Sequence, residues 1–392
     1  MISVQQAKKL IQEHSIALTP IQIQLSDAAG HTLAQDIYAS CDIPAFRQSS
    51  MDGYAVKFEE NISELSLAGE MAAGSDQENT INQGEAYRIF TGAPLPNGAD
   101  TVIMQEKVTI EGNRIFLNDP NLKAGLNARE KGSEISTGEI AMTRGNLLTP
   151  AALGFLAGIG TTWISVYPKP RVAIILTGNE LQKPGLPLNF GQVYESNSYA
   201  LTAALKQAGI ADIEVLEAKD ELKTLTEVLK AALKTNDMVL LTGGVSVGDY
   251  DFVIEAAVQC DVQQIFHKVK QKPGKPLYFG TKQQQLIFGL PGNPSSVLSC
   301  FYNYVLPAIA VLSNTSSKIQ QLEAELTSPY QKPAGLTHFL KGRYDAGKAT
   351  PLGAQESYRL SSFAQANCLI CLEEEKTTFN AGDKVSLFLL PN

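Results

Sequence analysis

The amino-acid sequence predicts a multidomain α/β protein with a doubly wound α/β domain, a small mostly-β inserted domain and a C-terminal β-barrel domain. The chain has 392 residues, more than the roughly 250–300 at which a single hydrophobic core stops growing. Between residues 168 and 317, apolar β-branched runs alternate with helical segments, as in a parallel sheet with crossover helices. Short strand-like runs separated by turns occur on both sides of that block. Several hydrophobic cores are therefore expected.

The small inserted domain is predicted at residues 38–136. Its strand-like runs include YRIFTG, TVIMQEKVTI and NRIFLN, and Gly, Asn and Pro separate them. The next segment, TPAALGFLAGIGTTWISVYPKP, returns to a helix followed by a strand. Pro168 and Pro170 then mark the beginning of the α/β block, because the residue before a proline is biased away from helix.

The doubly wound α/β domain is predicted at residues 168–317. It begins with the strand RVAIIL and alternates through SYALTAALKQAG, IEVLEA, ELKTLTEVLKAALKT and DMVLLTGG. DYDFVIEAAVQC follows as a helix, and then IFHKVK, PLYFG and LIFGL as strands. The closing helix, SSVLSCFYNYVLPAIAVL, has the apolar residues needed for burial against a sheet.

The C-terminal domain is predicted at residues 318–392. THFLKGRYD, YRLSSFAQANCLICLEE and DKVSLFLLPN are strand-like, and glycine turns separate them, which fits a β-barrel or sandwich. Cys368 and Cys371 in this domain have the spacing of zinc ligands. No second pair or histidine cluster accompanies them, so buried strand cysteines are the favoured interpretation.

Composition argues against several function classes. The net charge of −8 disfavours a broad nucleic-acid footprint, although it allows a local basic pocket for a small anion. No run of about 18 uninterrupted apolar residues is available to span a membrane. The amino terminus becomes polar by Gln5, unlike a secretory signal. We therefore expect a cytoplasmic protein that binds neither nucleic acid nor membrane.

A binding pocket is predicted at one edge of the parallel sheet. LTGNEL follows the first strand, Lys219 and Asp220 follow the second, and TGGVSVGDYD follows the third. HKVKQKPGKP accompanies the fourth strand and GLPGNPSS follows the last. Because loops at the carboxyl ends of parallel strands converge, these five loops are expected to form one pocket.

Two of these loops permit both a binding and a structural interpretation. In TGGVSVGD, backbone N–H groups beside adjacent glycines can approach an anion, but a glycine-rich turn explains the same residues. In GLPGNPSS, the proline and serine before a helix either contribute to an anion site or simply start the helix.

Charged residues in the other loops suggest an anion and a cation. HKVKQKPGKP carries four lysines: Lys268, Lys270, Lys272 and Lys275. The even-numbered lysines are expected on one strand face. Prolines and a glycine fix the last two lysines in a rigid loop, which favours an anion site over a solvated surface. Three carboxylates at the same end would hold a divalent cation, unless each only stabilises a helix amino terminus: Glu180, Asp220 and Asp251.

With these motifs assembled, the chain resembles the molybdopterin molybdenumtransferases, the family that includes bacterial MoeA proteins and the C-terminal domain of gephyrin. The resemblance covers essentially the whole chain. It rests on an ordered set of motifs: SSMDGYAV, FTGAPLPNGADTVIMQE, KGSEI, LTGNEL, SNSYAL, TGGVSVGDYDF, KPGKP and GLPGNPSS. It implies that molybdate is inserted into adenylylated molybdopterin, with Mg²⁺-dependent hydrolysis of the phosphoanhydride and release of AMP, to give the molybdenum cofactor.

The family resemblance also implies a homodimer of four-domain subunits. Residues 1–37 and 137–167 would form an extended linker domain, and the α/β domain would bind molybdopterin. The active site would lie between the α/β domain of one subunit and the inserted domain of the other. The implied protein partners are the molybdopterin adenylyltransferase and apo-molybdoenzymes.

Site residues follow from the same resemblance. The implied catalytic residues are Asp52, Thr91, Glu180, Asp220, Asp251, Lys268 and Lys272, with Glu180, Asp220 and Asp251 as the metal ligands. The implied substrate-binding residues are Glu134, Thr242, Gly243, Gly244, Ser246, Gly248, Lys275, Pro291, Gly292, Asn293, Pro294, Ser295, Lys341, Ser361 and Ser362. No covalent nucleophile is nominated, because molybdate oxygen or water can attack once it is positioned.

Two departures from the family pattern concern anion binding. KGSEI carries Glu134 where many relatives have aspartate, which moves the carboxylate by one methylene. HFLKGRYD places Lys341 where the family often has arginine, with Arg343 two residues later, and Ser361 or Ser362 as the hydroxyl candidates. Lysine would bind molybdate as a point charge, without the bidentate fork of arginine.

Three other classes of protein share features with this sequence. A scaffold of the gephyrin type would share this fold without catalysis, but the carboxylates Asp52, Glu180, Asp220 and Asp251 favour an enzyme. The related adenylyltransferase lacks both the SSMDGYAV domain and the C-terminal β domain. A dinucleotide-dependent oxidoreductase would need a GxGxxG motif after a predicted strand, and the sequence has none.

Overall fold

The computed structural model describes residues 1–245, 252–317 and 319–391. The chain folds into two compact units. Unit 1 contains Met1–Ile21, Gly30–Thr32 and Val166–Asn392, and unit 2 contains Gln22–Ala29 and Leu33–Ser165. The strands β1 (Ile21–Gln24), β2 (Thr32–Leu33) and β13 (Trp163–Tyr167) occur where the chain passes from one unit to the other.

Unit 1 contains a six-stranded sheet with the strand order β17-β14-β18-β22-β21-β19. Its strands are β14 (Val172–Thr177), β17 (Ile213–Ala218), β18 (Met238–Thr242), β19 (Gln263–His267), β21 (Tyr278–Lys282) and β22 (Gln285–Leu290). The first four strands in this order are parallel, whereas β21 is antiparallel to both of its neighbours. Every residue of β14 and β18 is buried, as in a sheet covered on both faces.

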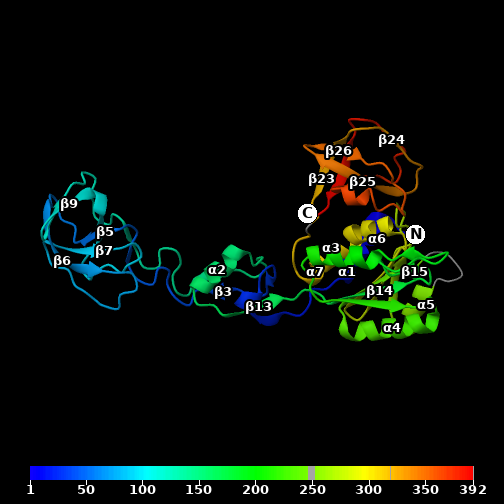
Figure 1. The fold of residues 1–392 in the computed structure, drawn as a ribbon, viewed down its shortest axis with the longest axis horizontal. Helices are drawn as coiled ribbons and strands as arrows, with labels where there is room; N and C mark the ends of the chain where they lie inside the picture. Colours follow the sequence, from blue (N-terminus) through cyan, green and yellow to red (C-terminus); the bar gives the residue numbers. More distant parts are fainter. Residues whose placement is uncertain (246–251, 318, 392) are drawn as a thin grey trace. The chain divides into compact units, whose positions relative to one another are not determined.

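Helices cover both faces of this sheet (Figure 1). On one face lie α4 (Leu222–Thr235) and α5 (Phe252–Gln259), which pack against alternate residues of β14 such as Ile175. On the other face lie α1 (Val4–His14), α3 (Asn197–Gln207) and the closing helix, which pack against the intervening residues such as Ile174. The predicted doubly wound α/β domain is confirmed.

The closing helix has three consecutive parts: α6 (Pro294–Cys300), a π-helical turn (Phe301–Val305) and α7 (Leu306–Leu312). The wider turn precedes Pro307, which has no backbone N–H to continue the α-helical pairing. The helix is long and apolar enough to cross a membrane, but 78% of its most apolar window is buried inside the protein. It is therefore a core helix, as its apolar sequence predicted.

The C-terminal part of unit 1 is a closed five-stranded barrel, which confirms the predicted architecture. Around the barrel the strands are β25 (Thr337–Asp345), β26 (Lys348–Pro351), β23 (Gln321–Leu326), β29 (Lys384–Leu389) and β27 (Cys368–Leu372). Pairing of β25 with β27 closes the barrel, and β24 (Tyr330–Gln331) pairs separately with β28 (Thr378–Phe379). Cys368 and Cys371 are free thiols on β27, and burial raises the pKa of Cys368 to about 12.

Unit 2 is mostly β structure, as predicted. Its main sheet has the order β8-β5-β7-β6-β10-β9. The strands are β5 (Gly53–Val56), β6 (Glu64–Met71), β7 (Glu85–Ile89), β8 (Thr101–Met104), β9 (Val108–Glu111) and β10 (Arg114–Leu117). Shorter elements are β3 (Ile37–Tyr38), β4 (Gln48–Ser49), β11 (Ala128–Arg129), β12 (Ile140–Met142) and the helix α2 (Pro150–Gly158).

The predicted strand IFHKVK is wrong in its second half. β19 ends at His267, and Lys268 has a left-handed backbone with a φ of 72°. Lys272 belongs instead to the short strand β20 (Gln271–Lys272), which pairs in parallel with β25 of the barrel. The even-numbered lysines therefore do not alternate along one strand face.

Candidate active site

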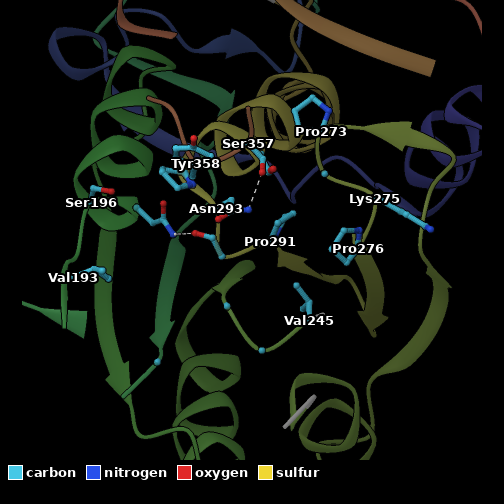
Figure 2. Close-up of a pocket in the computed structure, with 18 of the residues that line it drawn as sticks. Val193, Ser196, Val245, Pro273, Lys275, Pro276, Pro291, Asn293, Ser357 and Tyr358 are labelled. Carbon is cyan, nitrogen blue, oxygen red and sulfur yellow. Dashed lines mark hydrogen bonds between the residues drawn. The ribbon is translucent and has the colours of Figure 1, made fainter. Parts of the chain in front are cut away.

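A cavity of about 860 Å³ lies at the edge of the sheet where β14, β17, β18 and β22 end. The structure brings the five predicted loops together there. Each loop contributes to the cavity wall, for example through Gly178, Asp220, Gly243, Lys275 and Pro291. Figure 2 shows residues of different segments around this cavity, with Val193 and Ser196 on one side and Lys275 and Pro276 on the other.

Two of the predicted carboxylates line the cavity. Glu180 is exposed and precedes the short parallel pair of β15 (Leu181–Gln182) and β16 (Val193–Tyr194). Asp220 is half-buried, and its Oδ1 accepts a hydrogen bond of 3.3 Å from the hydroxyl of Thr177. Neither carboxylate has a lysine or arginine partner within 4.0 Å in the described part of the chain. Both therefore remain available to a cation or a ligand.

The glycine-rich loop after β18 packs directly against the loop after β14. Gly243 has a φ of 89°, and a Cβ atom on it would lie 2.5 Å from the carbonyl oxygen of Thr177. A left-handed backbone at such close range admits only glycine. Gly243 and Gly244 line the cavity, whereas Thr242 is buried inside β18 and does not.

The lysine segment is rigid where it lines the cavity. The side-chain Nε2 of the buried Gln271 donates to the carbonyl of Gly274 at 2.9 Å, and its Oε1 accepts from the hydroxyl of Tyr304. Gly274 has a φ of 84° and lies so close to Cys300 that a Cβ atom would be 2.5 Å from the sulfur. This packing fixes the loop against the closing helix.

The four lysines of this segment have different surroundings. Lys272 and Lys275 line the cavity, are exposed, and have no acidic partner among the described residues. Lys270 is paired instead with Glu374 at 2.7 Å. Lys268 does not line the cavity. The cavity thus combines unpaired lysines with unpaired carboxylates.

The last loop, from Pro291 to Pro294, lines the cavity before the start of α6. Asn197 at the start of α3 donates from Nδ2 to the carbonyl of Gly292 at 2.9 Å. The Oδ1 of Asn197 is buried and has no hydrogen-bond partner in the described structure, so it can accept from a ligand. Ser295 is fully buried at the start of α6 and does not line the cavity, although its neighbours do.

Sequence reasoning missed the contribution of the C-terminal barrel domain to this wall. Gln355, Ser357 and Tyr358 line the cavity. The hydroxyl of Ser357 accepts a hydrogen bond of 2.8 Å from Nδ2 of Asn293, as Figure 2 shows. Glu195 was also missed, although it is 8% exposed and lines the cavity at the start of α3. For Ser357, the only signal in the sequence was that it lies close to the expected residues Ser361 and Ser362. No periodicity distinguishes its position.

The structure places the hydroxyl candidates Ser361 and Ser362 away from the cavity. Ser361 is exposed and Ser362 is buried, and neither lines the cavity. The hydroxyl of Ser362 donates to the carbonyl of Ala354 at 2.8 Å. Ser357 is instead the serine of this segment that lines the cavity.

Lys341 does not lie at the cavity either. It is 1% exposed, and its ammonium donates to three backbone carbonyls, those of Ala354, Glu356 and Arg359. Since an ammonium has three N–H groups, none is left for molybdate. Arg343 is an exposed residue further along β25 and does not line the cavity.

Asp52, Thr91 and Glu134 belong to unit 2, whereas the cavity belongs to unit 1. Asp52 comes just before β5, and Thr91 comes just after β7. The two strands are antiparallel and Gly53 pairs with Ile89, so the start of β5 lies beside the end of β7 and Asp52 lies close to Thr91. The Oδ1 of Asp52 accepts hydrogen bonds from the backbone N–H of Thr91 at 2.7 Å and from its hydroxyl at 2.8 Å. These two bonds, in that order, lower the pKa of Asp52. Glu134 is exposed.

Three predicted residues lie outside the described residues: Ser246, Gly248 and Asp251. Among the residues that are described, no group of three or more His, Cys, Asp or Glu side chains could by itself hold a metal ion. A cation at the cavity would therefore need ligands beyond Glu180 and Asp220, such as water or a substrate phosphate.

Three family profiles match the chain. The profile described as the MoeA N-terminal region, domains I and II, matches residues 2–160. The probable molybdopterin binding domain matches residues 173–311. The MoeA C-terminal region, domain IV, matches residues 323–390.

Individual relatives agree with these profiles over the full length. A molybdopterin molybdenumtransferase of Staphylococcus epidermidis is 35% identical, over 99% of this chain and 95% of that protein. A protein of the same name from Haemophilus influenzae is 34% identical, over 99% and 98%. Among solved structures, a molybdopterin biosynthesis MoeA protein from a Pyrococcus species superposes with a TM-score of 0.84 at 28% identity, covering 99% of both chains.

Proposed function

The chain belongs to the molybdopterin molybdenumtransferase family, an enzyme family of molybdenum cofactor biosynthesis, and we propose that the cavity of unit 1 is where it inserts molybdate into adenylylated molybdopterin. The observation that carries this proposal is the convergence of the five loops on one cavity. No observation on the described residues favours a non-catalytic scaffold. Glu180 and Asp220, which a scaffold does not need, both line the cavity.

Lys272 and Lys275 would bind the anions. Both substrates are negatively charged, so their approach to one another must be offset by positive charge. The two lysines supply that charge without a competing carboxylate in the described structure. The hydroxyl of Ser357 and the buried Oδ1 of Asn197 would add hydrogen bonds that orient the substrate.

Glu180 and Asp220 would hold a Mg²⁺ ion. Mg²⁺ in enzymes is usually held by one or two carboxylates together with waters and substrate phosphates, and these two carboxylates are the unpaired ones described above. Bound there, the ion would neutralise the phosphoanhydride and stabilise the leaving AMP. Asp220 would be held in place for this by the hydroxyl of Thr177. Asp251 is the third proposed ligand.

The enzyme would act in the cytoplasm as a homodimer with shared active sites. Its five free cysteines suit a reducing compartment. Asp52 and Thr91 form an exposed hydrogen-bonded pair in unit 2, in which the pKa of the carboxyl is lowered, and we propose that this pair completes the cavity of the partner subunit. The protein partners would be the molybdopterin adenylyltransferase, which supplies the substrate, and apo-molybdoenzymes, which take up the product.

The four-domain division remains part of the proposal: residues 1–37 with 137–167, 38–136, 168–317 and 318–392. Support comes from the family profiles, which leave gaps between residues 160 and 173 and between residues 311 and 323. Expressing residues 38–136 alone would test the inserted domain. Cooperative unfolding of that fragment is the expected result.

The decisive experiment is reconstitution with purified protein, adenylylated molybdopterin, molybdate and Mg²⁺. AMP release and activation of an apo-molybdoenzyme are both expected. Omitting Mg²⁺ and adding EDTA should abolish both signals, and substituting Asp220→Asn should reduce them. If neither AMP nor an active molybdoenzyme appears with the wild-type protein, the proposed function is rejected.

A further inference from the structure

Lys341 is a buried cation with no carboxylate within 4.0 Å of its ammonium among the described residues. Burial lowers its pKa, and the more distant charge of Glu356 offsets part of that effect. Lys341 is 1% exposed, on β25 of the barrel. Its Nζ donates to the carbonyls of Ala354 at 2.7 Å, Arg359 at 3.0 Å and Glu356 at 3.3 Å. Burial of a charge is unfavourable unless hydrogen bonds satisfy it. These carbonyls are therefore the reason that the ammonium can be buried at this position.

The backbone of Lys341 holds the same segment, residues 352–359, which we call the barrel loop. Its N–H donates to Oε1 of Gln355 at 3.0 Å. Its carbonyl accepts from Nε2 of Gln355 at 2.8 Å and from the N–H of Leu352 at 2.9 Å. Ser362 adds a bond to the carbonyl of Ala354, a residue in the left-handed region with a φ of 53°. The barrel loop is thus fixed mainly from one residue.

The other side of the barrel loop forms a wall of the cavity. Gln355, Ser357 and Tyr358 all line it. The hydroxyl of Ser357 accepts from Asn293, and its carbonyl accepts from the N–H of Ser295 at 3.1 Å. A chain of direct contacts therefore runs from the ammonium of Lys341 through the barrel loop to the last loop of the sheet.

We propose that Lys341 is a positioning residue, whose ammonium fixes the barrel loop so that Ser357 and Tyr358 form the wall of the cavity that receives the pterin nucleotide. Lysine suits this task, because three rotatable N–H groups on one nitrogen can reach three converging carbonyls. The proposal replaces direct binding of molybdate by Lys341. It rests on the proposed function only for the identity of the ligand.

Hydrogen exchange of the full-length protein tests the fixing of the loop without any ligand. In Lys341→Met, amides of residues 352–359 should exchange about tenfold faster or more, because three buried carbonyls lose their donor. Strands β27 and β29 should keep their protection. Lys282→Met is the matched control, since Lys282 also donates to a backbone carbonyl, that of Cys260 at 2.7 Å. Lys282 lies at the end of β21, whereas the residues before the start of β21 line the cavity. The control should leave the exchange of the barrel loop unchanged.

Steady-state kinetics test the consequence for the cavity. Lys341→Met should raise the KM for adenylylated molybdopterin by about tenfold and change kcat little, and excess molybdate should not restore the wild-type KM. A general loss of folded protein would instead lower kcat. If the wild-type enzyme does not turn over, the proposed function fails while the exchange experiment still decides the role of Lys341.

Two results would overturn the proposal: unchanged exchange in the barrel loop of Lys341→Met, or full recovery of its activity by excess molybdate alone. If that variant does not fold, Ser362→Ala and Gln355→Ala carry the same comparison, because each removes a side-chain bond that holds the loop. Faster exchange of residues 352–359 in both supports the proposal. Wild-type exchange in both contradicts it.

Discussion

Asp52 and Thr91 form one of two matching pairs in unit 2. In the second pair, Oδ1 of Asp42 accepts hydrogen bonds from the backbone N–H of Thr137 at 2.7 Å and from its hydroxyl at 2.9 Å. The same two kinds of bond lower the pKa of both aspartates. Only the first pair belongs to the proposed catalytic set, so the second is a natural control.

Thr91→Val should raise the pKa of Asp52, because it removes the hydroxyl donor and keeps the backbone donor. A carboxyl group whose pKa is lowered by folding stabilises the folded state at pH values above the ordinary aspartate pKa. This stabilisation is lost as the pH falls through the lowered pKa. The acid limb of the activity profile should therefore move to higher pH. Carboxyl NMR titration and a pH–rate profile measure the two effects.

Thr137→Val should raise the pKa of Asp42 in the same way and leave the activity profile unchanged. Equal shifts of activity in both variants would contradict a catalytic role for Asp52. They would show instead that activity depends on the structure of unit 2, which the loss of a hydrogen bond in either pair disturbs.

Gly243 offers a second prediction for a single residue. Gly243→Ala should lower the free energy of unfolding by about 3 kcal/mol or more, because the new Cβ atom combines a left-handed backbone with a contact of 2.5 Å to Thr177. Gly382→Ala is the control, since Gly382 has the same φ of 89° with nothing within 4 Å. It should lose only about 1 kcal/mol. Denaturant unfolding of both variants measures the difference, and equal losses would contradict the close packing of the two loops.

The lysine segment shows what a single element contributes to binding. Lys272→Met and Lys275→Met should each raise the KM for adenylylated molybdopterin by about tenfold to a hundredfold, as expected for loss of a charged hydrogen bond. Lys270→Met should leave this KM unchanged, because Lys270 pairs with Glu374 outside the cavity. Initial rates at several substrate concentrations test the difference. A similar effect in all three variants would mean that only the net charge of the segment matters.

The same segment marks the limit of what the sequence could predict. The order of apolar runs and helical segments predicted the parallel sheet, and β14 and β18 are buried along their whole length, as a sheet covered on both faces requires. The sheet-edge loops followed from that order. The left-handed turn at Lys268 was not predictable, since lysine has no preference for this conformation and only the fold requires it.

Long-range contacts explain why the structure places some predicted site residues away from the cavity. Lys341 and Ser362 have the right chemistry for an oxyanion, and only the path of the barrel loop decides that they face its carbonyls instead. Ser357 is recognised as a cavity residue only in the folded structure, where Asn293, 64 positions away in sequence, donates a hydrogen bond to it. Spacing along the chain carries no information about such a meeting.

At the scale of the whole molecule, the proposed dimer predicts complementation. Asp52→Ala and Asp220→Ala should each be inactive alone, and mixed after unfolding and refolding they should regain about a quarter of wild-type activity. Half of the dimers would then be mixed, and one of their two sites would have both aspartates. AMP release from the mixture measures the recovery. No recovery, in a mixture shown to exchange subunits, would place both aspartates in one subunit's site.

The strand β20 joins the sheet of the barrel although it belongs to the lysine segment of the α/β part. During synthesis on the ribosome, the α/β layers are complete once Leu312 has been made. The partner strand of β20 and the wall formed by Ser357 are made only afterwards. A nascent chain would thus hold its lysines before it has the rest of the cavity, and it would become able to retain a reactive nucleotide intermediate only near the end of translation.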